Sequence, residues 1–546
     1  MSLPSRSLLL PVLLSLATVA AAQGLEQELG AGELRLRPEP TLRAPGAPSA
    51  GDTAPRAAPA AQPEAPSRAG ASAYATQTAL PPTVAGALQR AQVPLSAMSA
   101  LVIPVSGNGA ERLRHRADEV ISPASVMKLV TTYAAMDLLG PDFTWTTRFY
   151  TDGVLDKGTL RGNLYIKGGG DPKLVLERIQ AAFQALQDKG VVVVLGNMVL
   201  DNSAFELPPQ DPAAFDGEAL RPYNAGPDAL LVNFKSVVLK FSADPAAGVA
   251  RVTSEPPMAG LAIDATLPLA RGGGCGDWRG AIGARFDNVN AIRFTGRYPQ
   301  GCGDKEWAVA YQDPASYAAR ALEGLWRNSG GALTGKVVTG TTPPKARLLH
   351  EARSLPLSEI IADVNQWSNN VMAQQVFLTL GQLAPTRVDA MTVPRGPLQL
   401  ERQGRLERSR EIIARWWRNT FGIRQPAPVM DNGSGLSRVE RITADSLAAL
   451  LRHAARHPQG ATFVQSLSVA GVKGTAARVG RSTDSPAHGN AWLKTGTLRD
   501  VTGIAGYVNS PGGVRYVVVG FINHPNAVAA RPALDALVEW TASLSD

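Results

Sequence analysis

Ser125 and Lys128 are the side chains of this sequence best suited to nucleophilic chemistry. They lie three residues apart in Ser-Pro-Ala-Ser-Val-Met-Lys, residues 122–128. In a helix this spacing places both side chains on one face. A serine becomes a nucleophile when a neighbouring base accepts its proton, and a lysine can be that base where burial or a second cation favours its neutral form. The pair predicts acyl transfer through serine, although a helix cap followed by a surface lysine explains the same residues.

The residues around this pair predict a helix that begins just before it. Ser122 is a suitable N-cap and Pro123 suits the first helical position, and Gly140-Pro141 ends the mostly apolar run that follows. Ser125 would then lie in the first turn. Unpaired backbone N–H groups and the helix dipole favour developing negative charge there.

Polar residues of useful chemistry recur in two later segments. Residues 358–380 have the apolar spacing of one continuous helix, which Ser368 and Asn370 interrupt. Serine and asparagine are mediocre helix formers, so they have a function there or are simply exposed. Residues 491–497 predict a strand that contains Lys494-Thr495-Gly496. A glycine inside a strand indicates close approach by a ligand or by other backbone.

The elements that must position these groups can also be predicted. Residues 97–105 predict a strand that leads to Ser125, and residues 503–508 and 514–523 predict a hairpin. Residues 527–544 have the pattern of a closing amphipathic helix. Residues 146–350 differ, because short β-like runs alternate there with turn clusters. We expect an inserted β-rich region, which could comprise two subdomains.

The length of 546 residues requires two or three domains. We expect one domain to be assembled from residues 81–145 and 351–546, on either side of the insertion. Residues 23–80 are rich in Ala, Pro, Gly, Arg and Glu and nearly lack aromatic residues. Such a composition cannot bury enough surface to fold, so it predicts a disordered tether.

The N-terminus predicts an exported protein. Arg6 precedes an apolar stretch at 8–20, and Ala20-Ala21-Ala22 provides an A-x-A cleavage site. Residues 1–22 therefore predict a signal peptide and a periplasmic location. A transmembrane anchor is the alternative, but this run is short and no later run could span a bilayer. The net charge of +8 is spread along the chain, which argues against a nucleic-acid partner.

Cys275 and Cys302 are the only cysteines. In an exported chain an even pair predicts one disulfide, and two free buried thiols are the alternative. Two cysteines without CxxC spacing cannot build a structural zinc site. His453 and His457 lack the glutamate of an H-E-x-x-H motif. We expect neither a metal nor an organic cofactor.

The chain order of three short motifs is more specific than any one of them. Ser-x-x-Lys at 125–128, Ser-x-Asn at 368–370 and Lys-Thr-Gly at 494–496 form the set that marks penicillin-recognising serine enzymes. Each motif alone is weak, and Ser106-Gly107-Asn108 is a second Ser-x-Asn in the same chain. The ordered set, with each motif on a suitable element, is a strong indication.

Three further stretches extend the match, at residues 162–172, 431–438 and 488–492. With the long insertion, they make the chain from about residue 80 onward similar to the class C low-molecular-mass penicillin-binding proteins. This is the penicillin-binding protein 4 family of D-alanyl-D-alanine carboxypeptidase/endopeptidases. One departure is Asn432, an extra residue in the run at 431–438.

The resemblance implies the fold and the activity. The fold would be α+β with αβα layers, a penicillin-binding/β-lactamase-like transpeptidase domain in which helices flank an antiparallel sheet. The activity would be that of a serine D-Ala-D-Ala carboxypeptidase/endopeptidase on peptidoglycan stem peptides and cross-links. β-Lactams would acylate the same serine.

The resemblance also implies residue roles. Ser125 would attack the D-Ala-D-Ala peptide bond, and Lys128 would accept its proton. Ser368 would relay a proton to the leaving amine, while Asn370 would hold the lysine and the substrate amide. Lys494 would favour the neutral form of Lys128 by lowering its pKa.

Substrate binding would use the same strand edge. The backbone N–H groups of Ser125 and Thr497 would form the oxyanion hole. Thr495, Gly496 and Thr497 would line the subsite for the terminal carboxylate, to which Lys494 adds positive charge.

A second subsite would read the diamino acid of the stem peptide. Arg438 is the candidate for its carboxylate, and Glu218, with Asp216 as the substitute, for its ammonium. Tyr223 would pack against the methylene groups. Ordinary surface charges are the alternative interpretation.

Two other functions remain open from the sequence alone. A serine β-lactamase shares the three motifs, but its compact fold does not require the long stretch between Lys128 and Ser368. A non-catalytic cell-wall binding protein would not need the intact set of polar residues.

Overall fold

The computed structural model describes residues 76–106, 110–272, 274–389, 400 and 402–545. The predicted signal peptide and all of the predicted tether except residues 76–80 lie outside these ranges. Within them, no helix has both the length and the apolar composition that a membrane crossing requires.

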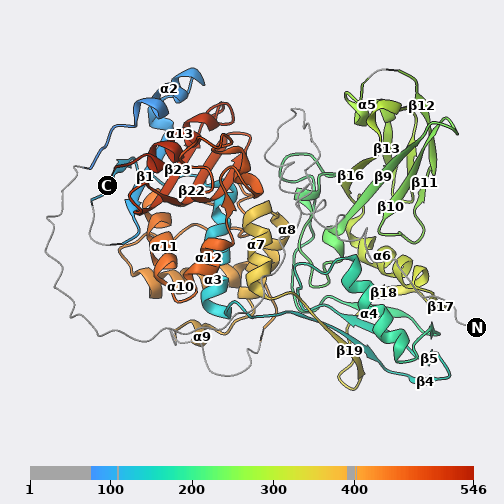
Figure 1. Cartoon of the computed structure of the whole chain (residues 1–546). Coiled ribbons are helices and arrows are strands. Elements are labelled where there is room, and N and C mark those ends of the chain that lie inside the picture. The colour runs from blue at the N-terminus through green and yellow to red at the C-terminus, as the bar shows by residue number, and fades with distance from the viewer. Residues whose placement is uncertain (1–75, 107–109, 273, 390–399, 401, 546) are drawn as a thin grey trace, which may run out of the picture.

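A six-stranded antiparallel sheet is the centre of one half of the structure (Figure 1). Its strand order is β2-β1-β23-β22-β21-β20, so strand β1 pairs with a strand from the far end of the chain. The strands are β1 (Met98–Pro104), β2 (Leu113–His115), β20 (Ser468–Val469), β21 (Ala491–Leu498), β22 (Val501–Asn509) and β23 (Arg515–Asn523). The predicted hairpin is β22–β23.

Both faces of this sheet are covered, since β22 and β23 are buried at every position except their ends. Val518 packs with α2 (Pro82–Arg90) and α13 (Arg531–Ala542) on one face. Val517 and Val519 pack with a group of helices on the other face. That group comprises α3 (Lys128–Leu139), α7 (Leu357–Trp367), α8 (Asn370–Leu380), α9 (Pro385–Asp389), α10 (Leu406–Phe421), α11 (Ala444–Arg456) and α12 (Gly460–Gln465). The predicted α+β fold with helices on both sides of an antiparallel sheet is confirmed.

The predicted start of the Ser125 helix is wrong. α3 begins only at Lys128, and a 3₁₀ turn, Ala124–Met127, precedes it. Ala124 has a φ of 48°, which a continuous α-helix cannot contain. Ser122 does not cap the helix, since Pro123 takes the N-cap position of the 3₁₀ turn and no side chain caps it. The backbone N–H and C=O of Ser122 instead pair with the Asn523 side chain.

The predicted continuous helix at 358–380 is also wrong. α7 ends at Trp367 and α8 begins at Asn370, because Ser368 takes the left-handed conformation with a φ of 60°. The Asn369 side chain then accepts a hydrogen bond from Met372 N at 3.0 Å and caps the new helix. Asparagine competes with a continuous helix in this way.

The stretch between α3 and α7 forms the other half of Figure 1 and contains several sheets. One group combines β18-β8-β6-β3-β19 and β17-β7-β5-β4 with α4 and α6. The other combines β15-β12-β10-β9-β16 and β11-β14-β13 with α5. An apolar core that includes Phe149, Phe241 and Trp326 runs through both groups. The exact domain boundaries stay a prediction.

The strands and helices of the inserted region are mostly short. The strands are β3 (Thr146–Thr151), β4 (Val154–Asp156), β5 (Thr159–Arg161), β6 (Leu164–Lys167), β7 (Val193–Val194), β8 (Met198–Asp201), β9 (Ser236–Asp244), β10 (Val249–Glu255), β11 (Ala262–Ile263), β12 (Thr266–Ala270), β13 (Ala284–Asn288), β14 (Ala291–Phe294), β15 (Tyr298–Pro299), β16 (Lys305–Ala310), β17 (Ala332–Leu333), β18 (Val337–Thr339) and β19 (Arg347–Arg353). The helices are α4 (Leu176–Asp188), α5 (Trp278–Ile282) and α6 (Pro314–Asn328).

Helix α8 is one of the elements that join the two halves. Its Gln375 side chain accepts from Asp228 N at 3.0 Å and donates to Asp228 O at 2.8 Å. Leu231 and Phe234 of the inserted region belong to the same apolar core as α3 and α8. The inserted region is therefore fixed against the helix that carries Asn370.

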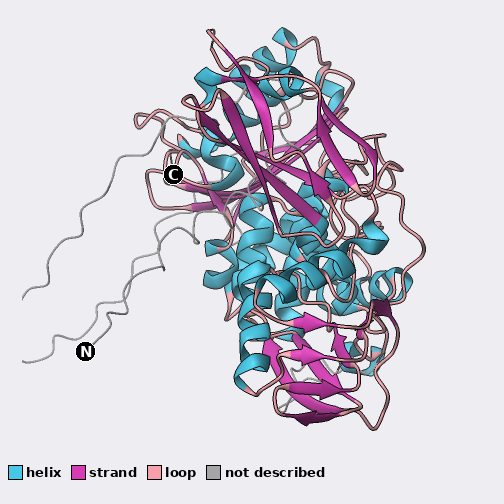
Figure 2. Cartoon of the chain, turned by 90° about the vertical axis from the view of Figure 1, so that its right-hand side faces the viewer, coloured by secondary structure: helices cyan, strands magenta, loops and turns pink. Residues whose placement is uncertain are grey.

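The predicted disulfide is present, with Cys275 and Cys302 joined at an Sγ–Sγ distance of 2.04 Å. It lies among the strands of the inserted region. Figure 2 views the molecule from that side, where strands gather at the two ends and helices lie between them.

We expect the disulfide to stabilise the inserted region without affecting the chemistry. Closing a loop with a sequence separation of 27 should contribute about 2–4 kcal/mol by restricting the unfolded chain. The double variant Cys275→Ala/Cys302→Ala should unfold at lower urea concentration than the oxidised protein, while penicillin still labels it at the same rate. Loss of labelling in the folded variant would show that the loop shapes the reactive site.

Candidate active site

Ser125 lies in the 3₁₀ turn that leads into α3, and Lys128 is the first residue of that helix. Both side chains are buried. Lys128 Nζ lies 2.9 Å from Ser125 Oγ, so the hydroxyl and the amine are in direct hydrogen-bond contact. The three-residue spacing therefore brings the two groups together, although the first of them is not in an α-helix.

Lys128 Nζ also bonds two oxygens from distant parts of the chain. Asn370 Oδ1 accepts at 2.6 Å, and the carbonyl of Ser434 accepts at 2.5 Å. If both N–H bonds of a neutral amine point to these two oxygens, its lone pair faces Ser125 Oγ. The geometry then suits transfer of the serine proton to the lysine.

The break between α7 and α8 places Ser368 and Asn370. The left-handed Ser368 accepts a hydrogen bond at Oγ from Lys494 Nζ at 2.8 Å. Asn370 begins α8, and its Nδ2 donates to the carbonyl of Tyr223 at 3.0 Å. The Ser-x-Asn segment thus contacts both lysines and the inserted region.

Strand β21 supplies Lys494 and the residues after it. A Cβ at Gly496 would lie 2.8 Å from Ser125 N and 2.9 Å from Val126 N. The predicted close approach at this glycine is confirmed, and the approaching group is the backbone of the Ser125 turn. Thr495 Oγ1 donates to Thr475 Oγ1 at 2.8 Å.

Arg531 and Thr475 join the site without any sequence signal. Arg531 Nη2 donates to Thr497 Oγ1 at 2.9 Å from the start of α13. Thr475 lies in the 3₁₀ segment Gly474–Arg478 beside β21. Neither belongs to a recognisable motif, so only the folded arrangement identifies them.

A tight loop at 431–435 holds the Ser434 carbonyl against Lys128. A Cβ at Gly435 would lie 1.9 Å from the Ala124 carbonyl, and Gly435 has a φ of 79°, so glycine is required there. The extra residue Asn432 organises the loop from within. Its Oδ1 accepts from Ser434 N at 2.9 Å, and its Nδ2 donates to Leu436 O at 2.9 Å.

The buried carboxylate of Glu440 collects the remaining amides of this loop. Oε1 accepts from the backbone N–H groups of Asp431 (3.0 Å), Asn432 (3.1 Å) and Gly433 (2.8 Å), and Oε2 accepts from Gly435 N (2.8 Å). Burial raises the pKa of this carboxyl, while the amide donors act in the opposite direction. Sequence reasoning missed Glu440, although it lies two residues after the run at 431–438. We infer that it positions Lys128 through the loop.

A segment of the inserted region overhangs Ser125. Phe215 and Tyr223 pack against a small apolar cluster formed by Ala124, Leu436, Leu498 and Val501. Tyr223 donates from its hydroxyl to Asp216 Oδ2 at 2.8 Å, and burial raises the pKa of this phenol. The segment therefore packs directly beside the Ser125 turn.

The predicted diamino-acid residues lie at the margin of this segment. The Arg438 guanidinium stacks 4.5 Å from the Phe215 ring centroid and bonds Asp500 Oδ1 at 3.1 Å. The Glu218 carboxylate is exposed and lies 3.4 Å from Arg221 Nε. Asp216 already accepts from Tyr223 and from Asn224 Nδ2, which makes it a poorer ammonium receptor than Glu218.

Comparison with known proteins matches the chain over most of its length. A profile of the D-Ala-D-Ala carboxypeptidase 3 (S13) family matches residues 84–544. A D-alanyl-D-alanine carboxypeptidase of Actinomadura sp. is 29% identical over 443 residues, which cover 76% of this chain and 76% of the relative. The D-alanyl-D-alanine carboxypeptidase DacB of Haemophilus influenzae is 24% identical over 406 residues, 73% of this chain and 80% of the relative.

A solved structure has the same fold. The crystal structure of penicillin binding protein 4 (dacB) from Haemophilus influenzae matches with a TM-score of 0.66 and 20% sequence identity. The match covers 84% of this chain and 99% of that chain. The inserted sheets are therefore part of the shared architecture.

We expect Glu440→Gln to loosen the 431–435 loop. The new amide nitrogen would face a backbone N–H group, and an unpaired buried donor costs about 1–3 kcal/mol. Hydrogen exchange of the Gly433 and Gly435 amides should accelerate by about tenfold for each 1.4 kcal/mol lost. Glu407→Gln is the control, since that side chain is 72% exposed on α10. Equal protection in both variants would contradict the role given to Glu440.

Proposed function

Because the chain belongs to the D-Ala-D-Ala carboxypeptidase 3 (S13) family, we propose that Ser125 is the nucleophile with which it hydrolyses D-Ala-D-Ala stem peptides and cross-links of peptidoglycan. The observation that carries this proposal is the contact of 2.9 Å between Lys128 Nζ and Ser125 Oγ, in a site where two carbonyl oxygens orient the amine. The reaction would pass through an acyl-enzyme.

In the first half of the reaction, Ser125 Oγ attacks the carbonyl carbon of the penultimate D-Ala while Lys128 accepts the hydroxyl proton. The backbone N–H groups of Ser125 and Thr497 stabilise the oxyanion. The C–N bond then breaks, and the proton reaches the leaving amine through Ser368. The hydrogen bond from Lys494 to Ser368 Oγ supports this relay, because it fixes the hydroxyl beside the strand that would bind substrate.

In the second half, water attacks the acyl carbonyl and Lys128 accepts its proton. The ester bond then breaks, Lys128 returns the proton to Ser125 Oγ, and the free enzyme is restored. The released acid is the stem peptide that ends in the former penultimate D-Ala, whether the leaving amine was the terminal D-Ala or the amine of a cross-link. Neither half requires a metal or an organic cofactor.

The terminal carboxylate of the substrate would lie beside Thr495, Gly496 and Thr497. The hydrogen bond from Arg531 to Thr497 Oγ1 supports this placement, since it adds a second cation next to Lys494. Carboxylates bind most strongly through such charge-assisted hydrogen bonds. A β-lactam carboxylate would use the same groups.

We further propose that the enzyme acts in the periplasm after removal of residues 1–22 as a signal peptide. A peptidoglycan substrate supports this location, because the cell wall lies outside the cytoplasm.

Penicillin should acylate Ser125, and the adduct should persist, because the acyl group shields its ester from water. Intact-mass measurement should show one adduct on the wild type and none on Ser125→Ala. Ser482→Ala, which changes an exposed serine far along the chain, should label normally. Labelling of Ser125→Ala would remove the proposed nucleophile, and turnover as fast as acylation would indicate a β-lactamase.

Glu218→Ala and Arg438→Ala should impair peptide hydrolysis but not penicillin acylation. Each loses a charge-assisted hydrogen bond to the diamino acid, worth about 1–3 kcal/mol in kcat/KM. Acetylated or truncated peptides should show no such loss. Arg251→Ala is the control, because this arginine also pairs with an aspartate but lies on β10. Equal losses on peptide and penicillin would show that the two residues support the overhanging segment and do not read the substrate.

A further inference from the structure

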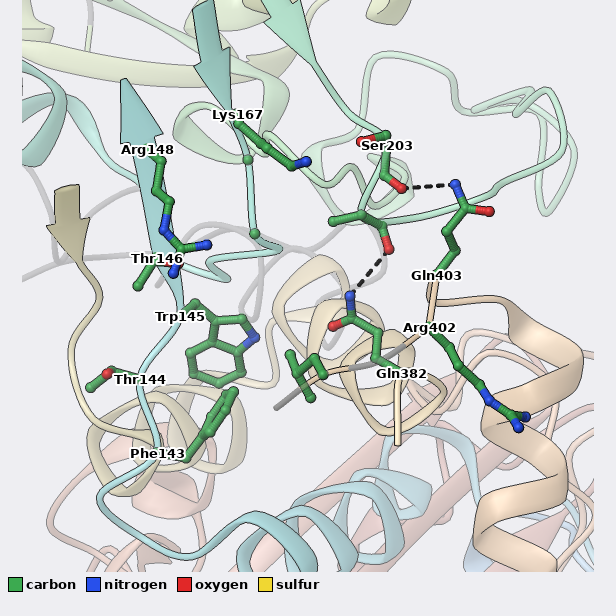
Figure 3. Close-up of a pocket in the computed structure, with 14 residues that line it drawn as sticks. Phe143, Thr144, Trp145, Thr146, Arg148, Lys167, Ser203, Gln382, Arg402 and Gln403 are labelled. Atoms are coloured by element: carbon green, nitrogen blue, oxygen red, sulfur yellow. Dashed lines mark hydrogen bonds between the residues drawn. The ribbon is translucent and has the colours of Figure 1, made fainter. Parts of the chain in front are cut away.

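A cavity of about 620 Å³ lies at the opposite end of α8 from Asn370. It is bounded by the start of β3, the end of β6, the loop after β8 and the residues that follow α8 (Figure 3). Gln382 lines it, twelve residues beyond Asn370. At a rise of 1.5 Å per residue, α8 alone separates the cavity by roughly 15 Å from Asn370, which contacts Lys128. It is therefore separate from the site described above.

The cavity is cationic. Arg148, Lys167 and Arg402 line it, and none of the described lining residues is acidic. Arg148 pairs with Glu351 at 2.8 Å, and Lys167 pairs with Asp201 at 3.7 Å. Neither carboxylate lines the cavity. The Arg148 and Lys167 side chains remain 43% and 39% exposed. Both can therefore bind an anion that enters the cavity.

Gln382 presents a buried acceptor to the same space. Its Nε2 donates to the carbonyl of Ala204 at 3.2 Å, which fixes the orientation of the amide. Its Oε1 is buried and accepts no hydrogen bond from the described residues, and the side chain as a whole is 4% exposed. Buried acceptors are nearly always satisfied, so this oxygen calls for a donor from a ligand.

The aromatic rings of Phe143 and Trp145 supply an apolar wall. In Figure 3 these rings face the Gln382 amide across the cavity, and Lys167 extends toward the same space. Arg402 also lines a neighbouring hollow, where Arg408, Arg415 and Arg418 outnumber the acidic Glu411. The cavity thus offers an anion site, an acceptor for an N–H group and an apolar surface, and the positive charge continues beyond it.

We propose that this cavity binds a carboxylate-bearing stem peptide other than the one cleaved at Ser125. The inference rests on the proposed function, since both stem peptides would belong to one peptidoglycan substrate. A peptide provides all the complementary groups, namely a carboxylate, amide N–H donors and methyl groups. An extended peptide spans 3.3–3.6 Å per residue, so about five residues bridge the distance to Ser125. The cavity would favour substrates that carry several stem peptides.

The direct test measures binding to the protein with Ser125 blocked by penicillin. The probe is the tripeptide L-Ala-γ-D-Glu-meso-diaminopimelate, titrated by calorimetry at low salt. We expect it to bind the blocked wild type, and to bind Lys167→Met and Arg402→Met at least fivefold more weakly. Lys345→Met removes an exposed lysine elsewhere and should bind as the wild type does. No binding to the blocked wild type, or equal binding by all three variants, would overturn the proposal.

Two further binding measurements identify the chemistry of the ligand. The tripeptide with amidated carboxyl groups should lose most of its affinity, and equal affinity would exclude carboxylate recognition. An oligogalacturonate that binds as tightly as the tripeptide would exclude a peptide-specific site. Failure of the proposed function would appear separately, as absence of acylation before any tripeptide is added. The same titration can then be run on unblocked Glu218→Ala/Arg438→Ala protein, because the diamino acid of the tripeptide would otherwise have a second subsite at these two residues.

Discussion

The Lys128 side chain is completely buried, and its amine contacts three segments that are far apart in the sequence. Burying an amine without partners is costly, whether it is charged or neutral. The Ser125 turn, the start of α8 and the 431–435 loop must therefore all reach the same nitrogen. The sheet behind α3 and the inserted region in front of α8 hold these segments in place. The geometry of the reactive pair thus depends on most of the chain.

That convergence requires backbone conformations that most residues avoid. Ala124 and Ser368 both have left-handed φ values, at a cost of about 1–3 kcal/mol each. The Ala124 backbone packs against Gly435, and Gly496 packs against the adjoining Ser125 backbone. Ser368 is followed directly by the Asn369 side-chain cap of α8. The strain falls next to the proposed nucleophile and to the proposed proton relay. It places Ser125 Oγ beside Lys128 Nζ and Ser368 Oγ beside Lys494 Nζ.

Much of the fold could be predicted from the sequence, because its patterns are local. The hairpin β22–β23 and the strand β21 follow from β-branched runs and from the turn between them. The disulfide follows from an even cysteine count together with the signal peptide predicted at the N-terminus. The helix boundaries at Ser125 and Ser368 could not be predicted, because they depend on tertiary contacts that favour left-handed residues. Ser125, Lys128 and Lys494 were identifiable by motif, whereas Glu440 and Arg531 act through contacts that no short motif records.

Under the proposed export, the sheet order has a consequence for the order in which parts of the emerging chain can fold. β1 lies beside β23, and Lys494 contacts Ser368, so the reactive centre cannot form until almost the whole polypeptide is available. The core of the inserted region instead uses only residues between Phe149 and Leu349, which are contiguous in the chain. It can therefore fold while the C-terminal strands are still being translocated. A nascent chain would then acquire its disulfide-containing half first, and it would gain a competent nucleophile only after the last strands arrive.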